Sequence, residues 1–182
     1  SEDDQEALKA RSPYNAVHID LPRVETSIGS DRYRHAGQLW RQWLGQGVVC
    51  AEKQPAFYAY RQTYTVPVSG ETRQLLGFIA AVRLVPWSEG VVLPHEHTFA
   101  KPKQDRLQLM RATAAQLSPV YGFYSDPTLS VEEAWRPRLA VEPQIAVRDD
   151  HGNLHEMWVI QDVEEIKVAQ ATLAETRVLI AD

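Results

Sequence analysis

The chain has 182 residues, of which 44% are hydrophobic and 24% are charged, and its formal net charge is −5 at pH 7. These values are typical of a globular protein with one hydrophobic core. Lysine and arginine dominate no long stretch, and no apolar run approaches the about 18 residues of a membrane span, so neither a nucleic-acid coat nor a membrane protein is expected.

Cys50 is the only cysteine, which excludes an intrachain disulfide and favours a reducing, cytoplasmic location. It lies in "GVVCAE" between a predicted helix and a predicted strand, where we expect a small buried thiol rather than a nucleophile. The chain begins directly in a helical pattern and ends on "TRVLIAD", which is typical of a core strand. We therefore expect a single α+β domain over residues 1–182, excised from a longer protein.

The first third of the chain predicts a helix in "DDQEALKAR", a short strand in "NAVHIDLP" that Pro22 stops, and a clear helix over residues 31–46. Ser30 or Asp31 can cap this last helix, and glycines end it. Its apolar residues recur at helical spacing and are expected in the core rather than on a platform for bases: Ala36, Leu39, Trp40, Trp43 and Leu44.

A long hairpin is predicted over residues 56–85. "AFYAYRQTYTVP" alternates in polarity, and "QLLGFIAAVRLV" returns as an apolar strand that we expect to be buried on both faces. Arg61 and Arg83 interrupt these strands, and a place at a sheet edge is the simplest account of both.

The second half continues with a helix from near Lys103, whose apolar stripe is expected at Leu107, Met110, Ala114 and Leu117. "VYGFYSD" and "RVLIA" predict strands, and residues 143–162 predict a second hairpin that turns at 149–153. Two capping boxes, Ser130 with Glu133 and Asp162 with Glu165, predict the starts of two helices. The whole pattern predicts an α+β fold with a mixed, mainly antiparallel sheet, two β-hairpins and interspersed helices.

One segment, "PHEHTFAKPKQDR" at residues 94–106, gathers more titratable side chains than its surroundings. A solvated loop would explain its polarity, and a metal site would use its histidines. Extended backbone places the imidazoles of His95 and His97 on one side, but zinc needs three or four ligands. His151 and His155 are expected at an exposed hairpin turn, so we predict no zinc site and leave open a loosely held divalent ion that accompanies a phosphate.

An anion site explains the particular residues of this segment better. Lys101, Lys103 and Arg106 flank a helix start, where unpaired amides and the helix dipole favour negative charge. Thr98 adds a hydroxyl donor, and Pro102 fits the first helical turn. We expect Arg106→Ala to weaken an anionic ligand about tenfold while the fold stays nearly intact.

Acid–base chemistry is a third interpretation of the same segment. His95, Glu96, His97 and Asp105 are candidate proton carriers next to the predicted anion.

The chain resembles the DUF1015 family of uncharacterised bacterial and archaeal proteins. The resemblance is carried in order by "SPYNAVHIDLP", "PAFYAYRQTY", "GFIAAVRL", "EGVVLPHEHTFAKPKQDRLQLMRATAAQLSPVYGFYSD" and "VLIAD". It implies a longer protein in which "IAD" leads into a Gly-His-His-Arg motif, similar to the nucleotide-phosphate motif of ParB/sulfiredoxin-fold proteins, including free-serine kinases. Asp182 would then enter this second phosphate site, and extending the chain past it should raise nucleotide affinity.

The resemblance implies a nucleotide-dependent phosphotransferase, a small-molecule kinase that uses ATP or ADP with Mg²⁺. In that hypothesis His95, Glu96 and Asp182 serve catalysis, and Thr98, Lys101, Lys103 and Arg106 bind the cofactor. The alternative is a non-catalytic regulatory module that binds a nucleotide or metabolite. A ParB-like nucleic-acid protein is disfavoured by the acidic net charge and by the lack of a basic stripe.

Overall fold

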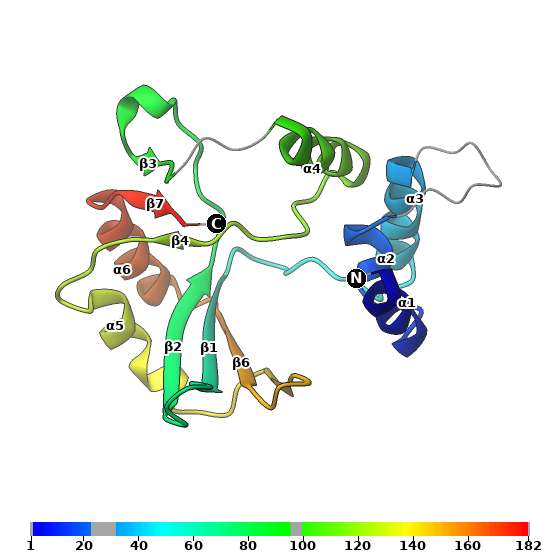
Figure 1. Ribbon diagram of the computed structural model, residues 1–182. Helices are drawn as coiled ribbons and strands as arrows, with labels where there is room; N and C mark the ends of the chain where they lie inside the picture. The colour runs from blue at the N-terminus through cyan, green and yellow to red at the C-terminus, as the bar shows by residue number, and fades with distance from the viewer. Residues whose placement is uncertain (1, 23–31, 96–99, 182) are drawn as a thin grey trace. The chain divides into compact units, whose positions relative to one another are not determined.

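The computed structural model describes residues 2–22, 32–95 and 100–181. The chain forms two compact units, of which unit 1 comprises Ser1–Ala51 and Glu96–Pro119, and unit 2 comprises Glu52–His95 and Val120–Asp182. Helices and strands are both present, so the predicted α+β class is confirmed (Figure 1). That all residues form one domain stays a prediction. In the part of the chain that is described, no helix is long and apolar enough to cross a membrane.

Unit 1 contains helices only among its described residues: α1 (Glu2–Arg11), α2 (Val17–Asp20), α3 (Arg32–Gly45) and α4 (Ala100–Thr113). Its buried apolar side chains come from three of them, and they are Val17, Ile19, Ala36, Trp43 and Leu109. Helices α3 and α4 approach closely at Gly37, where an added Cβ would lie 2.3 Å from the backbone oxygen of Ala112. Helix α3 confirms the helix predicted over 31–46, with Ala36 and Trp43 buried as expected, but Leu44 is 42% exposed rather than in the core. The predicted caps Ser30 and Asp31 lie outside the described residues.

Unit 2 is built on a four-stranded antiparallel sheet in the order β2-β1-β6-β5. The strands are β1 (Phe57–Thr65), β2 (Thr72–Ile79), β5 (Ile145–Arg148) and β6 (Leu154–Ile160). Both predicted hairpins are present as β1–β2 and β5–β6, and β1 and β6 join them in the middle of the sheet.

A smaller three-stranded sheet has the order β3-β7-β4, with β3 (Val92–Leu93) parallel and β4 (Gly122–Phe123) antiparallel to β7 (Val178–Ile180). The short helix η1 (Trp87–Glu89) precedes β3. Strand β7 confirms the predicted terminal strand, and the parallel pair makes the β structure mixed, as expected.

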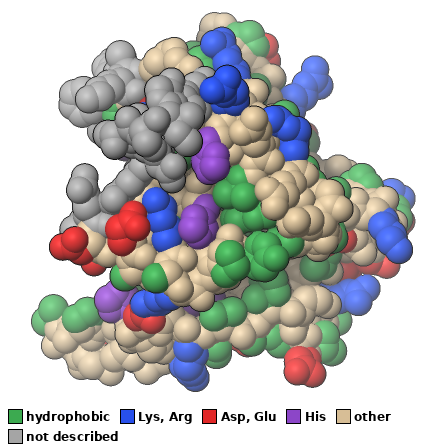
Figure 2. All heavy atoms as spheres, turned by 90° about the vertical axis from the view of Figure 1, so that its right-hand side faces the viewer, with side chains coloured by type: hydrophobic (Ala, Val, Ile, Leu, Met, Phe, Trp, Pro, Cys, Tyr) green, Lys and Arg blue, Asp and Glu red, His purple; other side chains and the backbone are tan. Residues whose placement is uncertain are grey.

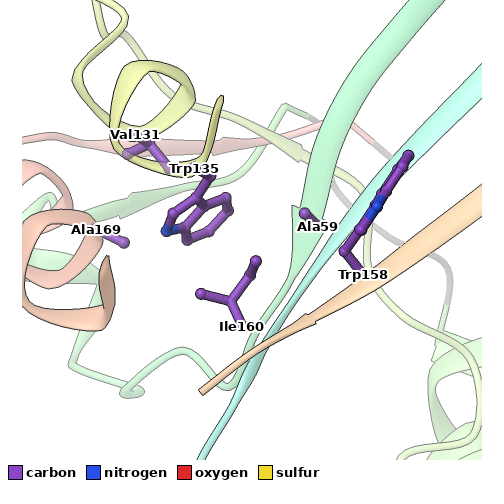
Figure 3. Close-up of a cluster of buried hydrophobic side chains, with 6 residues drawn as sticks. All are labelled: Ala59, Val131, Trp135, Trp158, Ile160 and Ala169. Carbon is purple, nitrogen blue, oxygen red and sulfur yellow. The ribbon is translucent and has the colours of Figure 1, made fainter. Parts of the chain in front are cut away.

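The core of unit 2 lies between the large sheet and helices α5 (Ser130–Leu139) and α6 (Val163–Ala174). Trp135 from α5 and Ala169 from α6 point toward Ala59, Trp158 and Ile160 of the strands (Figure 3). The rings of Phe57 and Phe78 pack against Trp135, with centroids 5.6 and 5.5 Å away. This apolar cluster occupies only one end of the helix-covered face of the sheet. The next pair of residues on that face, Arg61 of β1 and Glu156 of β6, is charged.

The segment "NAVHIDLP" was predicted as a strand, and that prediction is wrong. Val17–Asp20 forms helix α2, whose start is held by the side chain of Asn15, which accepts a hydrogen bond from the amide of Val17 at 3.1 Å. Val17 and Ile19 are buried, as an alternating strand would require. Four residues are too few for periodicity to separate a strand from a helical turn, and the local asparagine bond decided the outcome.

The return strand of the first hairpin is shorter and more exposed than predicted. β2 ends at Ile79, opposite Tyr58 near the start of β1, so residues 80–85 have no β1 partner. β2 lies at the edge of the described sheet, and its side chains are mostly exposed rather than buried on both faces. An apolar composition alone could not reveal which strand lacks a second neighbour.

Two helix details also differ from the sequence prediction. At α5 the capping residue is Leu129, which has a left-handed backbone conformation. The carboxylate of Asp126, rather than the hydroxyl of Ser130, accepts a hydrogen bond from the backbone amide of Val131. At α6 the predicted Asp162 cap is confirmed, since its carboxylate accepts from two backbone amides, while Glu165 bonds Arg138 instead of completing a box.

Helix α4 buries a different face from the predicted stripe. Leu107 and Met110 are 37% and 43% exposed, whereas Leu109 and Thr113 are buried. The helix ends at Thr113 and the next residue, Ala114, has a φ of 53°, so Ala114 and Leu117 do not continue it. Cys50 is exposed rather than buried, because it follows the end of α3 in an irregular segment.

Candidate functional site

Segment 94–106 is described only in part. Glu96, His97 and Thr98 lie outside the described residues, as do Asp182 and the side chain of Lys101. His95 is exposed just after β3, and α4 begins at Ala100, three residues earlier than predicted. From the sequence we also expect His95, Glu96 and Thr98 to turn toward a cleft, and this stays a prediction because Glu96 and Thr98 lie outside the described residues.

Lys103 is an exposed side chain at the start of α4. The first turn of this 14-residue helix contains Lys101 and Lys103 and no acidic residue. Positive side chains at a helix N-terminus face the positive end of the helix dipole, which is unfavourable unless an anion lies between them. The unfavourable placement of lysines at a helix start, from which the sequence predicted an anion site, is therefore present in α4.

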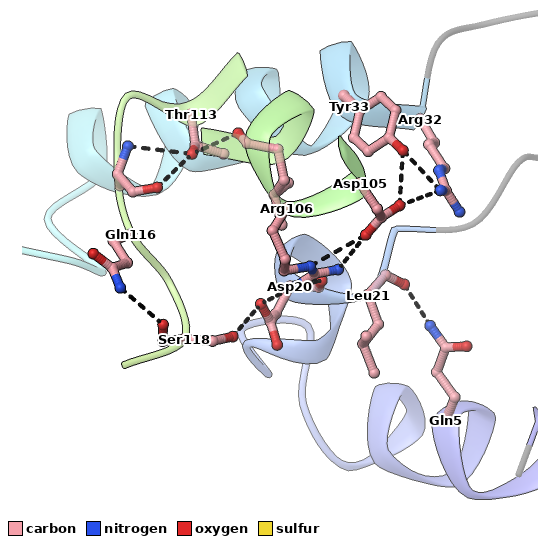
Figure 4. A network of polar contacts seen from close by, with 12 residues as sticks. Gln5, Asp20, Leu21, Arg32, Tyr33, Asp105, Arg106, Thr113, Gln116 and Ser118 are labelled. Atoms are coloured by element: carbon pink, nitrogen blue, oxygen red, sulfur yellow. Dashed lines mark hydrogen bonds and ion pairs between the residues drawn. The ribbon is translucent and has the colours of Figure 1, made fainter. Parts of the chain in front are cut away.

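Arg106 is held by two carboxylates of unit 1 rather than standing open to a ligand. Its Nη1 donates to Oδ1 and to the backbone oxygen of Asp20, each at 3.0 Å, and its Nη2 donates to Oδ2 of Asp105 at 2.8 Å. Figure 4 shows Arg106 reaching from α4 toward Asp20 at the end of α2. Ser118 donates to the same Asp20 carboxylate at 2.8 Å. Arg106 thus ties α4 to α2.

Asp105 lies at the centre of the same network. Arg32 pairs with its Oδ1, and the hydroxyl of Tyr33 donates to that oxygen at 2.7 Å (Figure 4). Burial raises the pKa of Asp105, but the hydrogen bonds and positive charges around it outweigh burial and hold the pKa below its ordinary value. Because such a carboxylate stays ionised near neutral pH, Asp105 is poorly suited to donate a proton.

We expect Arg106→Ala to lower the free energy of unfolding of unit 1 by about 1–2 kcal/mol, since it leaves Asp20 and Asp105 without their shared donor. The expected loss is modest because the paired groups are 25–39% exposed. Chemical denaturation without ligand measures the effect. Arg111→Ala, at an exposed position on the same helix, serves as the control and should change stability by less than about 0.5 kcal/mol. Equal stabilities of the two variants would return Arg106 to the ligand-binding role predicted from the sequence.

A polar cluster that sequence reasoning missed lies on the large sheet of unit 2. The hydroxyl of Tyr60 is 2.6 Å from Nδ1 of His155, whose Nε2 is 3.2 Å from Oδ2 of Asp149. His155 is half-buried, although it was expected at an exposed turn. Tyr60 on β1 and His155 on β6 lie on the same face of the sheet. This could be predicted only with knowledge of the register between the two hairpins.

The electrostatics of this cluster favour a structural role. Burial raises the pKa of Tyr60, and the negative charge of Asp149 adds to the rise, so the phenol is not activated for proton transfer. Burial also raises the pKa of Asp149, but hydrogen bonds from Asn153, His155 and backbone amides outweigh it and lower that pKa strongly. Asp149 accepts from the amides of His151 and Asn153, each at 2.9 Å, and thereby organises the β5–β6 turn.

Arg61 is the second unexpected feature of unit 2. It lies on the central strand β1 and not at an edge, and its Nε and Nη2 donate to the two carboxylate oxygens of Glu156 at 2.8 and 2.9 Å. Its guanidinium carbon is 4.7 Å from the ring centroid of Trp158. The hydrogen bond from Arg61 is the main cause that lowers the pKa of Glu156. Arg83, by contrast, lies beyond the end of β2 and is exposed.

Neither the charges on the face drawn in Figure 2 nor the candidate metal ligands among the described residues form a dense group. On the face drawn in Figure 2, lysine, arginine, aspartate and glutamate side chains lie singly or in small groups among uncharged ones. Among the described residues, no three or more histidine, cysteine or acidic side chains are grouped so that they could hold a metal ion. The expected absence of zinc stays a prediction, because His97 and Glu96 are outside this search.

Comparisons with known proteins give one result. A family model described as "Protein of unknown function (DUF1015)" matches residues 1–182. Comparisons with curated proteins and with solved structures found no significant match. Since the family model matches all 182 residues, the chain belongs to the DUF1015 family.

Proposed function

We propose that the protein is a nucleotide-dependent phosphotransferase that acts on a small molecule and holds a nucleotide phosphate at the start of α4. The observation that carries this proposal is the first turn of α4, which contains Lys101 and Lys103 and no acidic residue. Backbone amides that have no partner within the helix, together with the helix dipole, attract an anion to such a turn. A lysine adds a compact charge that suits phosphate.

The other roles come from the sequence and its family resemblance. Thr98 would add a hydroxyl donor, His95 or Glu96 would move the proton of the acceptor, and Asp182 would lead into a second phosphate loop. ATP or ADP with Mg²⁺ would be the cofactor. Phosphoryl transfer depends mainly on positioning and charge stabilisation, so this small set of side chains is chemically sufficient. Because Arg106 is bonded to Asp20 and Asp105, we assign it the positioning of α4 rather than a phosphate contact.

Thermal-shift measurements on the full-length protein test the proposal and separate it from a regulatory module. ATP or ADP with Mg²⁺, amino acids and phosphorylated metabolites are added singly and in pairs. Stabilisation by a nucleotide, followed by release of ADP from ATP or of AMP from ADP when an acceptor is present, supports the phosphotransferase. Stabilisation by one metabolite with no turnover supports the regulatory module. No stabilisation by any nucleotide contradicts both the phosphotransferase and the nucleotide-sensing alternative.

We expect Lys103→Ala to weaken binding of ATP with Mg²⁺ by about tenfold, because it removes one charge-assisted phosphate contact. Stability without ligand should hardly change, since Lys103 is exposed. Isothermal titration calorimetry on the full-length protein measures both affinities. Lys53→Ala, an exposed lysine of unit 2, is the matched control and should bind like the unchanged protein. Equal affinities of the unchanged protein and the two variants would show that the start of α4 does not bind the nucleotide.

A further inference from the structure

We propose that a hollow between strand β2, helix α5 and residues 124–129 binds a small organic cation, an alkylated ammonium ion with a single positive charge. Aromatic rings contact its methyl groups, and two carboxylates balance its charge. The hollow belongs to unit 2, whereas the start of α4 belongs to unit 1. This inference therefore does not rest on the proposed phosphotransferase activity.

The lining of the hollow is the first observation. The hollow has a volume of about 210 Å³, its walls are mainly apolar and aromatic, and both of its charged lining residues are acidic. The side chains that matter here are Phe78, Tyr124, Trp135, Leu129, Asp126 and Glu132. Apolar walls that carry negative charges alone suit an organic cation better than an anion or an uncharged ligand.

The aromatic walls are the second observation. The ring of Phe78 lies between those of Tyr124 and Trp135, with centroids 5.5 Å from each. Its plane is inclined by 59° to the ring of Tyr124 and by 82° to the ring of Trp135, so the rings line the hollow from different directions. Phe78 and Tyr124 are half-buried, which leaves part of each ring accessible. The face of an aromatic ring attracts a cation, and the attraction increases when water is removed from the pair.

The two carboxylates of the hollow keep their negative charge. Among the described residues, Glu132 has no hydrogen-bond or ion-pair partner for its side chain. Asp126 accepts hydrogen bonds from the backbone amide of Val131 at 3.1 Å and from the hydroxyl of Thr128 at 3.0 Å. Burial raises the pKa of Asp126, but such hydrogen bonds outweigh burial and hold the pKa below its ordinary value. These donors are neutral, so Asp126 is ionised at neutral pH and its charge is not cancelled.

Neighbouring positive charges do not cancel the charge of these two carboxylates. Arg61 binds Glu156 at 2.8 and 2.9 Å, and Arg136 pairs with Glu133, so each arginine has a carboxylate of its own. The N-terminus of α5 contributes about +0.5 elementary charge, which leaves an excess of about −1.5. Burial raises the pKa of Tyr124, and the negative charges of the two carboxylates at the hollow add to the rise, so both act on its aromatic wall. A singly charged cation balances most of this excess.

An alkylated ammonium ion fits this hollow better than a metal ion does. Ca²⁺ and Mg²⁺ need several oxygen ligands at short distances. In the ranges that the structure describes, no three or more histidine, cysteine or acidic side chains are grouped in that way. Leu76 and Leu129 at the hollow are 36% and 51% exposed, and methyl groups on a nitrogen remove such apolar surface from water.

Titration of the full chain with choline, followed by NMR of its backbone amides, tests the proposal. Choline should shift the amides of Gly77, Asp126 and Glu132 saturably at low salt, with a Kd of about 1 mM or less. Neohexyl alcohol, in which carbon replaces the nitrogen of choline, keeps the shape without the charge and should bind at least about tenfold more weakly. Ammonium chloride, which has the charge without the methyl groups, should also bind at least about tenfold more weakly. Equal binding of choline and neohexyl alcohol, or no saturable shift up to about 10 mM choline, would overturn the proposal.

Two pairs of variants test the carboxylate and the aromatic wall separately. Glu132→Gln should weaken choline binding about fivefold, whereas Glu142→Gln, at an exposed position of unit 2 outside the hollow, should bind choline normally. Tyr124→Leu should also weaken choline binding about fivefold, whereas Tyr124→Phe keeps the ring and should bind choline normally. The dispersion of the amide signals shows whether each variant is folded. Unchanged choline affinity of Glu132→Gln would contradict the proposal even if Tyr124→Leu failed to fold.

Further titrations distinguish a free cation from the same group on a larger molecule. A peptide with trimethyllysine that binds at least about tenfold more tightly than choline would assign the hollow to a protein partner. Sedimentation of the chain with phosphatidylcholine vesicles, prevented by choline, would assign the hollow to a lipid surface. Either result would end the proposal of a small-molecule site, and weaker binding of both probes than of choline supports it.

Discussion

Replacing Trp135 by alanine is expected to lower the free energy of unfolding of unit 2 by about 3–5 kcal/mol. Trp135 is 3% exposed and packs against Phe57 and Phe78, and its indole N–H donates to the backbone oxygen of Glu165 at 3.2 Å. The substitution leaves a cavity between α5 and the sheet and also removes the hydrogen bond from the indole to α6. Denaturation followed by circular dichroism gives the total loss, and amide hydrogen exchange assigns it to unit 2.

Trp87→Ala is the matched control for this prediction. Trp87 is 63% exposed in η1, so the same change of side chain should cost less than about 0.5 kcal/mol. A loss below about 1 kcal/mol for Trp135→Ala would show that the cluster in Figure 3 is not the main core of unit 2.

Gly37→Ala is expected to destabilise unit 1 by about 1–3 kcal/mol, although alanine is the better helix former. A Cβ at residue 37 would lie 2.3 Å from the backbone oxygen of Ala112 and 2.9 Å from its carbonyl carbon. A flexible side chain could turn away, but these are backbone atoms of α4, so the two helices must move apart. The gain in helix propensity, about 1 kcal/mol, only partly offsets the lost packing.

Gly45→Ala separates the steric effect from propensity. Gly45 is the last residue of α3, and an added Cβ there meets no atom within 4 Å. This control should be neutral or slightly stabilising, by up to about 1 kcal/mol. Hydrogen exchange in α3 and α4 should accelerate for Gly37→Ala alone. Unchanged exchange in both variants would contradict the close approach of the two helices.

The contacts of Arg106 show that residues of one candidate site can have different roles in the folded chain. Lys103 and Arg106 looked equivalent in the sequence, since both are cations at the start of one predicted helix. In the structure Lys103 is exposed, whereas Arg106 donates to Asp20, a residue 86 positions earlier in the chain. We therefore propose different roles for these two residues, and the two alanine variants test the roles with different measurements, ligand affinity for one and stability for the other.

The sequence by itself determined the fold class and most of the elements. Apolar spacing placed the helix over 31–46, alternation placed β1, and the turn residues at 149–153 placed the second hairpin. These features depend on interactions between residues near one another in the chain, which propensity and periodicity report directly. The family resemblance found from the quoted motifs is likewise confirmed over residues 1–182.

Only the tertiary structure decided which strand lies at an edge and which polar groups meet. β2 is apolar enough for a buried strand, but the pairing of β1 with β6 leaves it at the end of the described sheet. The same pairing brings Arg61 to Glu156 and Tyr60 to His155, each pair separated by 95 positions in the chain. These contacts cannot be predicted from local sequence, because they depend on the register between two hairpins. A shift of one residue would turn every side chain of a strand to the opposite face.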